Sequence, residues 1–457
     1  MTTPVADTDV SRGEKRASGL ARLVQWFRPA PHMSRLPQSE IARLYPVYRW
    51  RIFEAAFIAY ATFYIVRNNL APVSKQFMEA LHYDEVMVGH ILSGTAIAYG
   101  IGKFVMGYLA DRSDARKYVA LGMLLTAALN FLFGASRNFQ AHLFLWTLNG
   151  FIQGMGYGPC TRGLSHWYSV KERGSIFGAW NISHNIGGGI AGVLAANCAK
   201  HWGWSSAFYA PGIIATICAF YLFWRMRDTP QSLGLPPVEE YKNKYPPEER
   251  ESHECELSTQ ELLFKYILPN KMLWVLSFAN IFVYIARYAM VDWGPLYLQK
   301  VKGASLSQGG FSTLLIEFSG AAGMLLMGWL SDKIGGRRGR VSVLSMIPLL
   351  VIFPAILFTP KGLLWLDLVL FALLGFFVYT PVLFSGVISL DLTTKKAVGT
   401  AAGFVGFFGY LGRVIQAEGL GRIAKYYGWT PAFWAVLGCT FVGIILLAFT
   451  WNVRPRG

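Results

Sequence analysis

Two arginines lie inside apolar stretches of the sequence, in short segments that repeat each other. Tyr64-Ile-Val-Arg67 and Tyr284-Ile-Ala-Arg287 place these arginines 220 residues apart (287 − 67). An arginine in the middle of a membrane helix costs about 2.5–3.5 kcal/mol on insertion scales and therefore needs a partner. Because a planar guanidinium binds two oxygens of a phosphate or carboxylate at once, the pattern predicts an anionic substrate, preferably one that carries phosphate. The alternative is that each arginine pairs permanently with a membrane carboxylate such as Asp292 or Glu317, or reaches an interface.

Other polar side chains in the apolar stretches are candidates for the same site. Lys103 lies two turns before Asp111 and either adds positive charge to the cavity or extends to the cytoplasmic face. His184 lies near the middle of its stretch, where it either bonds the substrate and titrates near neutral pH or packs as a structural histidine. Five tyrosines lie near the proposed cavity, although any one of them could serve packing alone: Tyr60, Tyr64, Tyr284, Tyr379 and Tyr410.

A second motif repeats at nearly the same offset. Gly107-Tyr-Leu-Ala-Asp111-Arg112 and Gly328-Trp-Leu-Ser-Asp332-Lys333 place their aspartates 221 residues apart (332 − 111). Two motifs with almost one offset indicate a duplicated unit whose halves are related by an axis along the membrane normal. We expect Asp111, Arg112, Asp332 and Lys333 to lie in gating loops. There they would form ion pairs between helices in one conformational state.

The sequence contains no arrangement of residues that suits an enzyme. It has no Walker A loop, so ATP is not the expected energy source, and we predict no cofactor. The five cysteines are widely spaced and form no CxxC, which indicates neither a disulfide framework nor a metal site.

The composition is that of an integral membrane protein. The 457 residues are 53% hydrophobic and only 15% charged, whereas soluble domains carry about 25% charged residues. A bilayer needs roughly 20 apolar residues per helix. This predicts an all-α membrane protein with about twelve spans, near 52–72, 86–109, 118–136, 141–163, 175–198, 205–225, 273–297, 308–331, 341–359, 362–387, 398–421 and 430–451.

Charge in the connecting loops predicts the orientation. The net charge is +16, and lysine and arginine collect in alternate loops on the side of both termini. By the positive-inside rule, these loops are cytoplasmic. We expect a cytoplasmic tail (1–51), two six-helix halves (52–226 and 273–452), a cytoplasmic central loop (227–272) and a cytoplasmic C-terminus (453–457). The same rule explains the basic charge without a nucleic-acid partner.

Many stretches resemble the organophosphate:phosphate antiporter family of the major facilitator superfamily. They span nearly the whole chain after residue 50 and include FYIVRNN (63–69), AYGIGKFVMGYLADRSDAR (98–116), WNISHNIGGG (180–189), RDTPQSLGLPPVEEYKN (227–243) and FVYIARYAMVDWGPLYL (282–298). The resemblance implies the major facilitator fold in a bacterial inner membrane. It also implies exchange of an external organic phosphate for inorganic phosphate by alternating access, with glycerol-3-phosphate as the first candidate.

The resemblance further implies roles for particular residues. Arg67 and Arg287 would clamp the phosphate, with Lys103 and His184 beside them. Asp292 and Glu317 would pair with the arginines when no substrate is bound. The remaining cavity residues would be Tyr60, Tyr64, Asn181, Tyr284, Tyr379 and Tyr410.

Four residues depart from the glycerol-3-phosphate members of the family and leave the substrate open. Tyr157 replaces a tryptophan, Asn68 replaces a lysine, and Arg413 and Glu418 are additional charges that either bind substrate or pair with each other. Hexose phosphates and phosphoglycerates are alternative substrates.

Two other classes of function are alternatives to an antiporter. One is a membrane receptor that senses external hexose phosphate and signals to a membrane kinase, and the other is a flippase or drug exporter. In each case we expect a monomer in a lipid bilayer.

Overall fold

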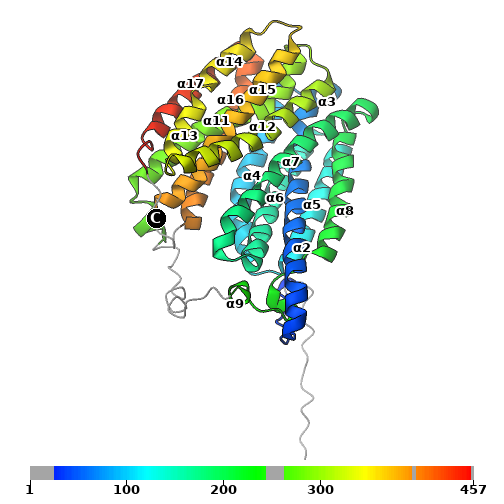
Figure 1. Cartoon of the computed structure of the whole chain (residues 1–457). Coiled ribbons are helices and arrows are strands. Elements are labelled where there is room, and N and C mark those ends of the chain that lie inside the picture. Colours follow the sequence, from blue (N-terminus) through cyan, green and yellow to red (C-terminus); the bar gives the residue numbers. More distant parts are fainter. Residues whose placement is uncertain (1–24, 243–261, 394–397, 454–457) are drawn as a thin grey trace, which may run out of the picture.

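The structure is a computed structural model that describes residues 25–242, 262–393 and 398–453. Within these ranges the regular structure is helical (Figure 1). The first half contains six spans, the first of which is divided into two helices. Its elements are α2 (Gln38–Ile65), α3 (Leu70–Leu81), α4 (Glu85–Asp111), α5 (Ala115–Ala135), α6 (Phe139–Trp167), α7 (Val170–Trp202) and α8 (Ser206–Arg225).

The second half also contains six spans, and its third span is divided. A connection with the short helices η1 (Pro230–Leu233), α9 (Val238–Tyr241) and η3 (Leu262–Ile267) precedes it. The spans of this half are α11 (Lys271–Lys300), α12 (Leu306–Lys333), α13 (Arg338–Met346) with α14 (Leu349–Phe358), α15 (Leu364–Asp391), α16 (Val398–Tyr427) and α17 (Trp429–Ala448).

Equivalent helices pack together in the two halves. In the first half, α4 packs on α6 and α2 packs on α7. The equivalent pairs of the second half are α12 with α15 and α11 with α16. α5 also packs on α8 as α14 packs on α17. The duplication predicted from two short motifs is therefore repeated in the helix packing, and the expected fold of two pseudo-symmetric six-helix halves is confirmed.

Hydropathy alone identifies only part of this fold. Seven helices of the described residues are long and apolar enough to cross a membrane. The others, α2, α4, α6, α7 and α16, carry more polar groups, among them Lys103, His184 and Arg413. Large apolar side chains also face outward, for example Ile217 at 65% and Val351 at 71% exposure, as expected for a surface in contact with lipid.

The two halves are joined tightly at one end of the molecule. α3 packs against α11, α4 against α16 and α7 against α12. Side chains at the ends of these helices form ion pairs across the halves, namely Lys300 with Glu85 at 2.7 Å and Lys425 with Asp84 at 2.8 Å. We call this end the sealed end.

The opposite end carries the start of α2 and the connection with α9 (Figure 1). A wide recess of about 480 Å³ lies toward this end of the first half. It is lined by α6 and α7 through Thr161, Arg162, Ser165, His166 and Phe177. We call this end the open end.

Candidate substrate-binding site between the two halves

Arg67 lies where the first span is interrupted. α2 ends at Ile65 and α3 begins at Leu70, so Arg67 is held in a turn rather than in the continuous helix that its sequence predicts. A break inside a membrane is tolerated only when the freed backbone groups find partners. Here the carbonyl of Val66 accepts hydrogen bonds from Asn130 Nδ2 (3.1 Å) and Asn149 Nδ2 (3.4 Å). Two buried asparagines thus support the turn that presents Arg67.

The guanidinium of Arg67 is buried among aromatic rings. It is 5% exposed and lies 3.8 Å from the ring centroid of Tyr64 and 4.8 Å from that of Tyr99. Its Nε has no hydrogen-bond partner, and the described residues place no carboxylate within 4.0 Å of it. A buried charge without an opposite charge is strongly unfavourable. Arg67 is therefore suited to an anion that enters from outside the protein.

Arg287 has the same kind of surroundings but a different backbone. It lies within the continuous helix α11, is 4% exposed and stacks 4.1 Å from the Tyr379 ring. Its Nη2 donates a 3.0 Å hydrogen bond to the Tyr379 hydroxyl, while its Nε lacks a partner. No ion pair joins Arg287 to a carboxylate in the described ranges.

His184 lies between the two arginines. Its ring is 5.1 Å from the Tyr64 ring and 6.3 Å from the Tyr379 ring, the two rings on which the arginines stack. The Nδ1 atom of His184 contacts the carbonyl of Asn181 one turn earlier in α7. Arg67 from one half and Arg287 from the other are thereby brought to a common site.

Lys103 adds a third positive charge, beside Arg67 and Arg287, on the open side of this site. Its Nζ lies 4.5 Å from the Tyr157 ring, and Tyr157 in turn packs 6.0 Å from Tyr60. The lysine therefore faces the ring of Tyr157, which packs beside Tyr60 inside the protein, and not only the membrane surface.

The five predicted tyrosines are brought together around the arginines. Tyr60 contacts Tyr64 at 5.3 Å, and Tyr284 contacts Tyr410 at 5.7 Å between ring centroids. Tyr379 is fully buried. The five tyrosines thus surround one site, and of Asn181 the structure shows the backbone carbonyl in contact with His184. Their roles in binding stay predictions.

Carboxylates of the site do not pair with the two central arginines in this conformation. Asp292 accepts hydrogen bonds from Arg413 Nε (3.1 Å) and Arg413 Nη2 (2.9 Å). Glu317 is held across the halves by Asn185 Nδ2 at 3.0 Å, and its second oxygen has no hydrogen-bond partner. If Arg67, Arg287, Lys103 and Arg413 are charged and both carboxylates are ionised, the site carries 4 − 2 = +2, which one phosphate dianion would neutralise.

The two additional charges in α16 have separate partners. Arg413 pairs with Asp292, whereas Glu418 contacts His90 Nδ1 at 2.8 Å and Ser93 Oγ at 2.5 Å across the halves. They therefore do not pair with each other, and Glu418 belongs to the sealed end.

The expected gating residues lie at the open end. Arg112 stacks on the Tyr108 ring at 3.7 Å, and Lys333 stacks on the Trp329 ring at 3.9 Å. Asp332 is exposed, and the side chain of Asp111 lies outside the described side chains. Their proposed pairing between helices belongs to another conformation and stays a prediction.

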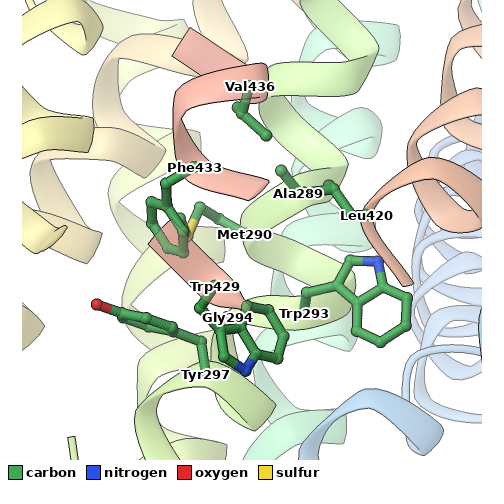
Figure 2. Close-up of a pocket in the computed structure, with 9 residues that line it drawn as sticks. All are labelled: Ala289, Met290, Trp293, Gly294, Tyr297, Leu420, Trp429, Phe433 and Val436. Carbon is green, nitrogen blue, oxygen red and sulfur yellow. The ribbon is translucent and has the colours of Figure 1, made fainter. Parts of the chain in front are cut away.

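A separate apolar cavity lies inside the second half (Figure 2). It measures about 10 Å³ and is lined by side chains of α11, α16 and α17 such as Met290, Leu420 and Phe433. No charged side chain lines it, so it is a packing gap and not the binding site.

Sequence reasoning missed several contributors to the site. Tyr99 and Tyr288 stack on the arginines, and Asn130 and Asn149 support the helix break. Tyr288 directly follows Arg287, which was the only local signal available. The asparagines come from distant helices, and only their hydrogen bonds to the Val66 carbonyl reveal this role.

This fold and site define a polytopic membrane transporter with a charged cavity between two six-helix halves, and not an enzyme. The sequence profile described as Major Facilitator Superfamily matches residues 56–417. The chain belongs to this superfamily.

Several curated proteins are similar over almost their whole length. The glycerol-3-phosphate transporter of Bacillus subtilis is 39% identical, with 94% of this chain and 98% of the relative covered. A probable hexose phosphate transport protein of Chlamydia trachomatis is 40% identical, with 94% and 97% covered. The membrane sensor protein UhpC of Escherichia coli is 34% identical, with 91% and 95% covered.

Solved structures are similar in fold at low sequence identity. A bacterial homologue of the human lysosomal transporter Spinster, in an inward-facing and unoccupied conformation, aligns with a TM-score of 0.68 at 16% identity. The alignment covers 89% of this chain and 96% of that chain. It supports the fold and no finer statement.

Proposed function

We propose that the protein exchanges an external organic phosphate for inorganic phosphate by alternating access, with glycerol-3-phosphate as the first candidate substrate. The observation that carries this proposal is the pair Arg67 and Arg287. They come from different halves, are buried, and have no carboxylate partner in the described structure. A phosphate dianion bound by both would supply the missing charge and join the halves. The relatives named for glycerol-3-phosphate and hexose phosphate support this class of substrate.

The proposed transport step follows from where the site lies. In the conformation seen here, ion pairs close the sealed end, and the recess lies toward the open end. Phosphate bound between the arginines would draw the halves together at the open end, where Arg112 and Lys333 lie. Separation of the sealed end would then release the substrate on the other side.

We propose that the open end faces the cytoplasm of a bacterial cell. Lysine and arginine in alternate loops support a cytoplasmic location for both termini and the central loop, within an inner membrane. Labelling of single cysteines from each side of the membrane tests this orientation. A central loop that reacts from outside would contradict it.

Counterflow in proteoliposomes tests the exchange. Vesicles loaded with inorganic phosphate are supplied outside with labelled glycerol-3-phosphate, a hexose 6-phosphate or 3-phosphoglycerate. We expect uptake of at least one organic phosphate that depends on internal phosphate. Loss of uptake in Arg67→Lys, with a normally inserted protein, would connect the activity to the proposed site.

A receptor for hexose phosphate is the second candidate, because UhpC is similar over 95% of its length. This function predicts binding of a hexose phosphate without counterflow. Binding and counterflow measured on the same preparation therefore separate the two functions.

A further inference from the structure

We propose that Arg413 is a positioning residue that holds Asp292 away from Arg67 and thereby keeps Arg67 free to bind phosphate. This inference rests on the proposed function for its final step, but the pairing itself can be tested without any ligand. Arg413 is an unexpected charge in the sequence, which offered the substrate or Glu418 as its partner, whereas the structure pairs it with Asp292.

Arg413 forms a bidentate ion pair with Asp292. Two of its guanidinium nitrogens donate to the two different carboxylate oxygens of Asp292, at 2.9 and 3.1 Å. Both side chains are 4% exposed. The guanidinium also lies 4.1 Å from the Tyr288 ring, which fixes it on a further side. Such bidentate geometry uses both oxygens of the carboxylate.

Asp292 is placed where it could reach a different arginine. A cavity of about 10 Å³ on the sealed side of the site is lined by Arg67, Asp292 and Arg413 together with Asn68 and with apolar and hydroxyl side chains. Arg67 enters this cavity from the first half, and the other two enter from the second half. Of the residues that line the cavity, Asp292 is the one acidic group that the two arginines share.

The competition between the two arginines decides whether Arg67 can bind substrate. Arg67 already lacks a carboxylate, and its charge and that of Arg413 repel each other. If Arg413 lost its charge, Asp292 would be a buried carboxylate without a partner beside an unpaired guanidinium. Both groups are strongly unfavourable alone, so they would pair with each other. A substrate phosphate would then have to displace Asp292 before it could bind Arg67.

The ligand-free test is a double-mutant cycle between Arg67→Gln and Asp292→Asn, measured by thermal unfolding of the purified protein. In the native background, we expect the two substitutions to shift the Tm independently. In the Arg413→Gln background, we expect a coupling of roughly 2–5 °C, because Arg67 and Asp292 then form an ion pair. A cycle with no coupling in the Arg413→Gln background would overturn the proposal.

The ligand test is rescue of binding. Arg413→Gln should weaken the affinity for inorganic phosphate or the transported organic phosphate by roughly ten-fold or more. Adding Asp292→Asn to Arg413→Gln should restore most of the affinity, since the competing carboxylate is gone. A purely structural role for Arg413 predicts no such rescue, and failure of rescue with a folded protein would overturn the proposal.

Arg422→Gln is the matched control, because it makes the same change on the same helix at an exposed position. It should change neither the coupling nor the affinity.

The two tests also separate this inference from the proposed function. If the native protein binds no phosphate compound while the coupling appears as expected, the proposed function is wrong and the pairing role of Arg413 stands.

Discussion

Arg287 donates a 3.0 Å hydrogen bond from Nη2 to the hydroxyl of Tyr379, and its guanidinium stacks 4.1 Å from the same ring. One tyrosine from α15 therefore fixes both the plane and the rotation of an arginine on α11. Arg67 stacks on the rings of Tyr64 and Tyr99, in a turn that buried asparagines support.

Tyr379→Phe should weaken phosphate binding by about three- to ten-fold. The change removes one hydrogen bond, worth about 0.5–1.5 kcal/mol net, but retains the ring on which Arg287 stacks. Calorimetric titration with the transported phosphate measures the loss. Tyr297→Phe is the control, because Tyr297 lies on α11 with Arg287 but lines the apolar cavity of Figure 2. Equal affinities for Tyr379→Phe and the native protein would show that Arg287 needs no such support.

Arg67→Lys and Arg287→Lys should each weaken binding by roughly ten- to a few hundred-fold. Each keeps the positive charge but loses the planar fork, and a hydrogen bond to a charged group contributes about 1.5–3 kcal/mol. Because both arginines would hold one ligand, the double substitution should not show additive losses. Calorimetry and counterflow on the three variants provide the measurement, with Arg422→Lys as a control. If both single variants fold normally and retain native affinity and exchange, the two-arginine clamp is wrong.

Asn130→Ala should destabilise the first half by about 1–3 kcal/mol, because the carbonyl of Val66 loses a partner inside the membrane. Asn130 also accepts a 2.9 Å hydrogen bond from Asn69, so the loss extends to a second buried group. Thermal or denaturant unfolding in detergent measures the change. Asn197→Ala is the control, since Asn197 is exposed and bonds only its own helix among the contacts described. Equal stabilities of the two variants would contradict the proposed support of the helix break.

Gly192→Val should prevent full closure of the sealed end. A Cβ at Gly192 would lie 2.6 Å from the backbone oxygen of Gly310, which belongs to the other half. Since backbone cannot move as a side chain can, α7 and α12 would have to separate. Distances between spin labels on the two halves should increase at the sealed end. Gly438→Val has open space around its Cβ and should leave the distances unchanged. A closed sealed end in Gly192→Val would show that this contact is not required.

Asp84→Asn should open the sealed end by the same amount at pH 6 and pH 8. Partial burial raises the pKa of the Asp84 carboxyl, but the hydrogen bond and charge of Lys425 and the backbone N–H of Met87 together outweigh this and lower the pKa below its ordinary value. Because the pKa is lowered in the paired state, the ionised Asp84 carboxylate stabilises that state fully at every pH above its ordinary pKa of about 3.9. This stabilisation is lost only as the pH falls through the lowered pKa. Asparagine still caps α4, so the change isolates the charge.

The spin-label distances described above measure this effect as the difference between Asp84→Asn and the native protein at each pH. Lys425→Gln should give the same opening, and combining the two substitutions should add nothing. A difference that varies between pH 6 and pH 8 would mean that another titrating group controls the Asp84–Lys425 pair.

The sequence by itself determined the architecture and the central chemistry of this protein. Arg67 and Arg287 stand out because a charge in an apolar stretch is costly, and their nearly equal spacing from the second motif reveals the duplication without any structure. Length and composition were enough to count the spans, even for helices such as α4 and α7 that hydropathy alone does not select.

Only the tertiary structure decided which charges pair and where the first span breaks. Asp292 could pair with Arg67, Arg287 or Arg413, and the choice depends on the side of each helix that faces the cavity. The break at Arg67 depends on Asn130 and Asn149, which approach Val66 from two other helices. Both outcomes are set by distances between residues far apart in the chain, because ion pairs and hydrogen bonds act over only a few ångströms.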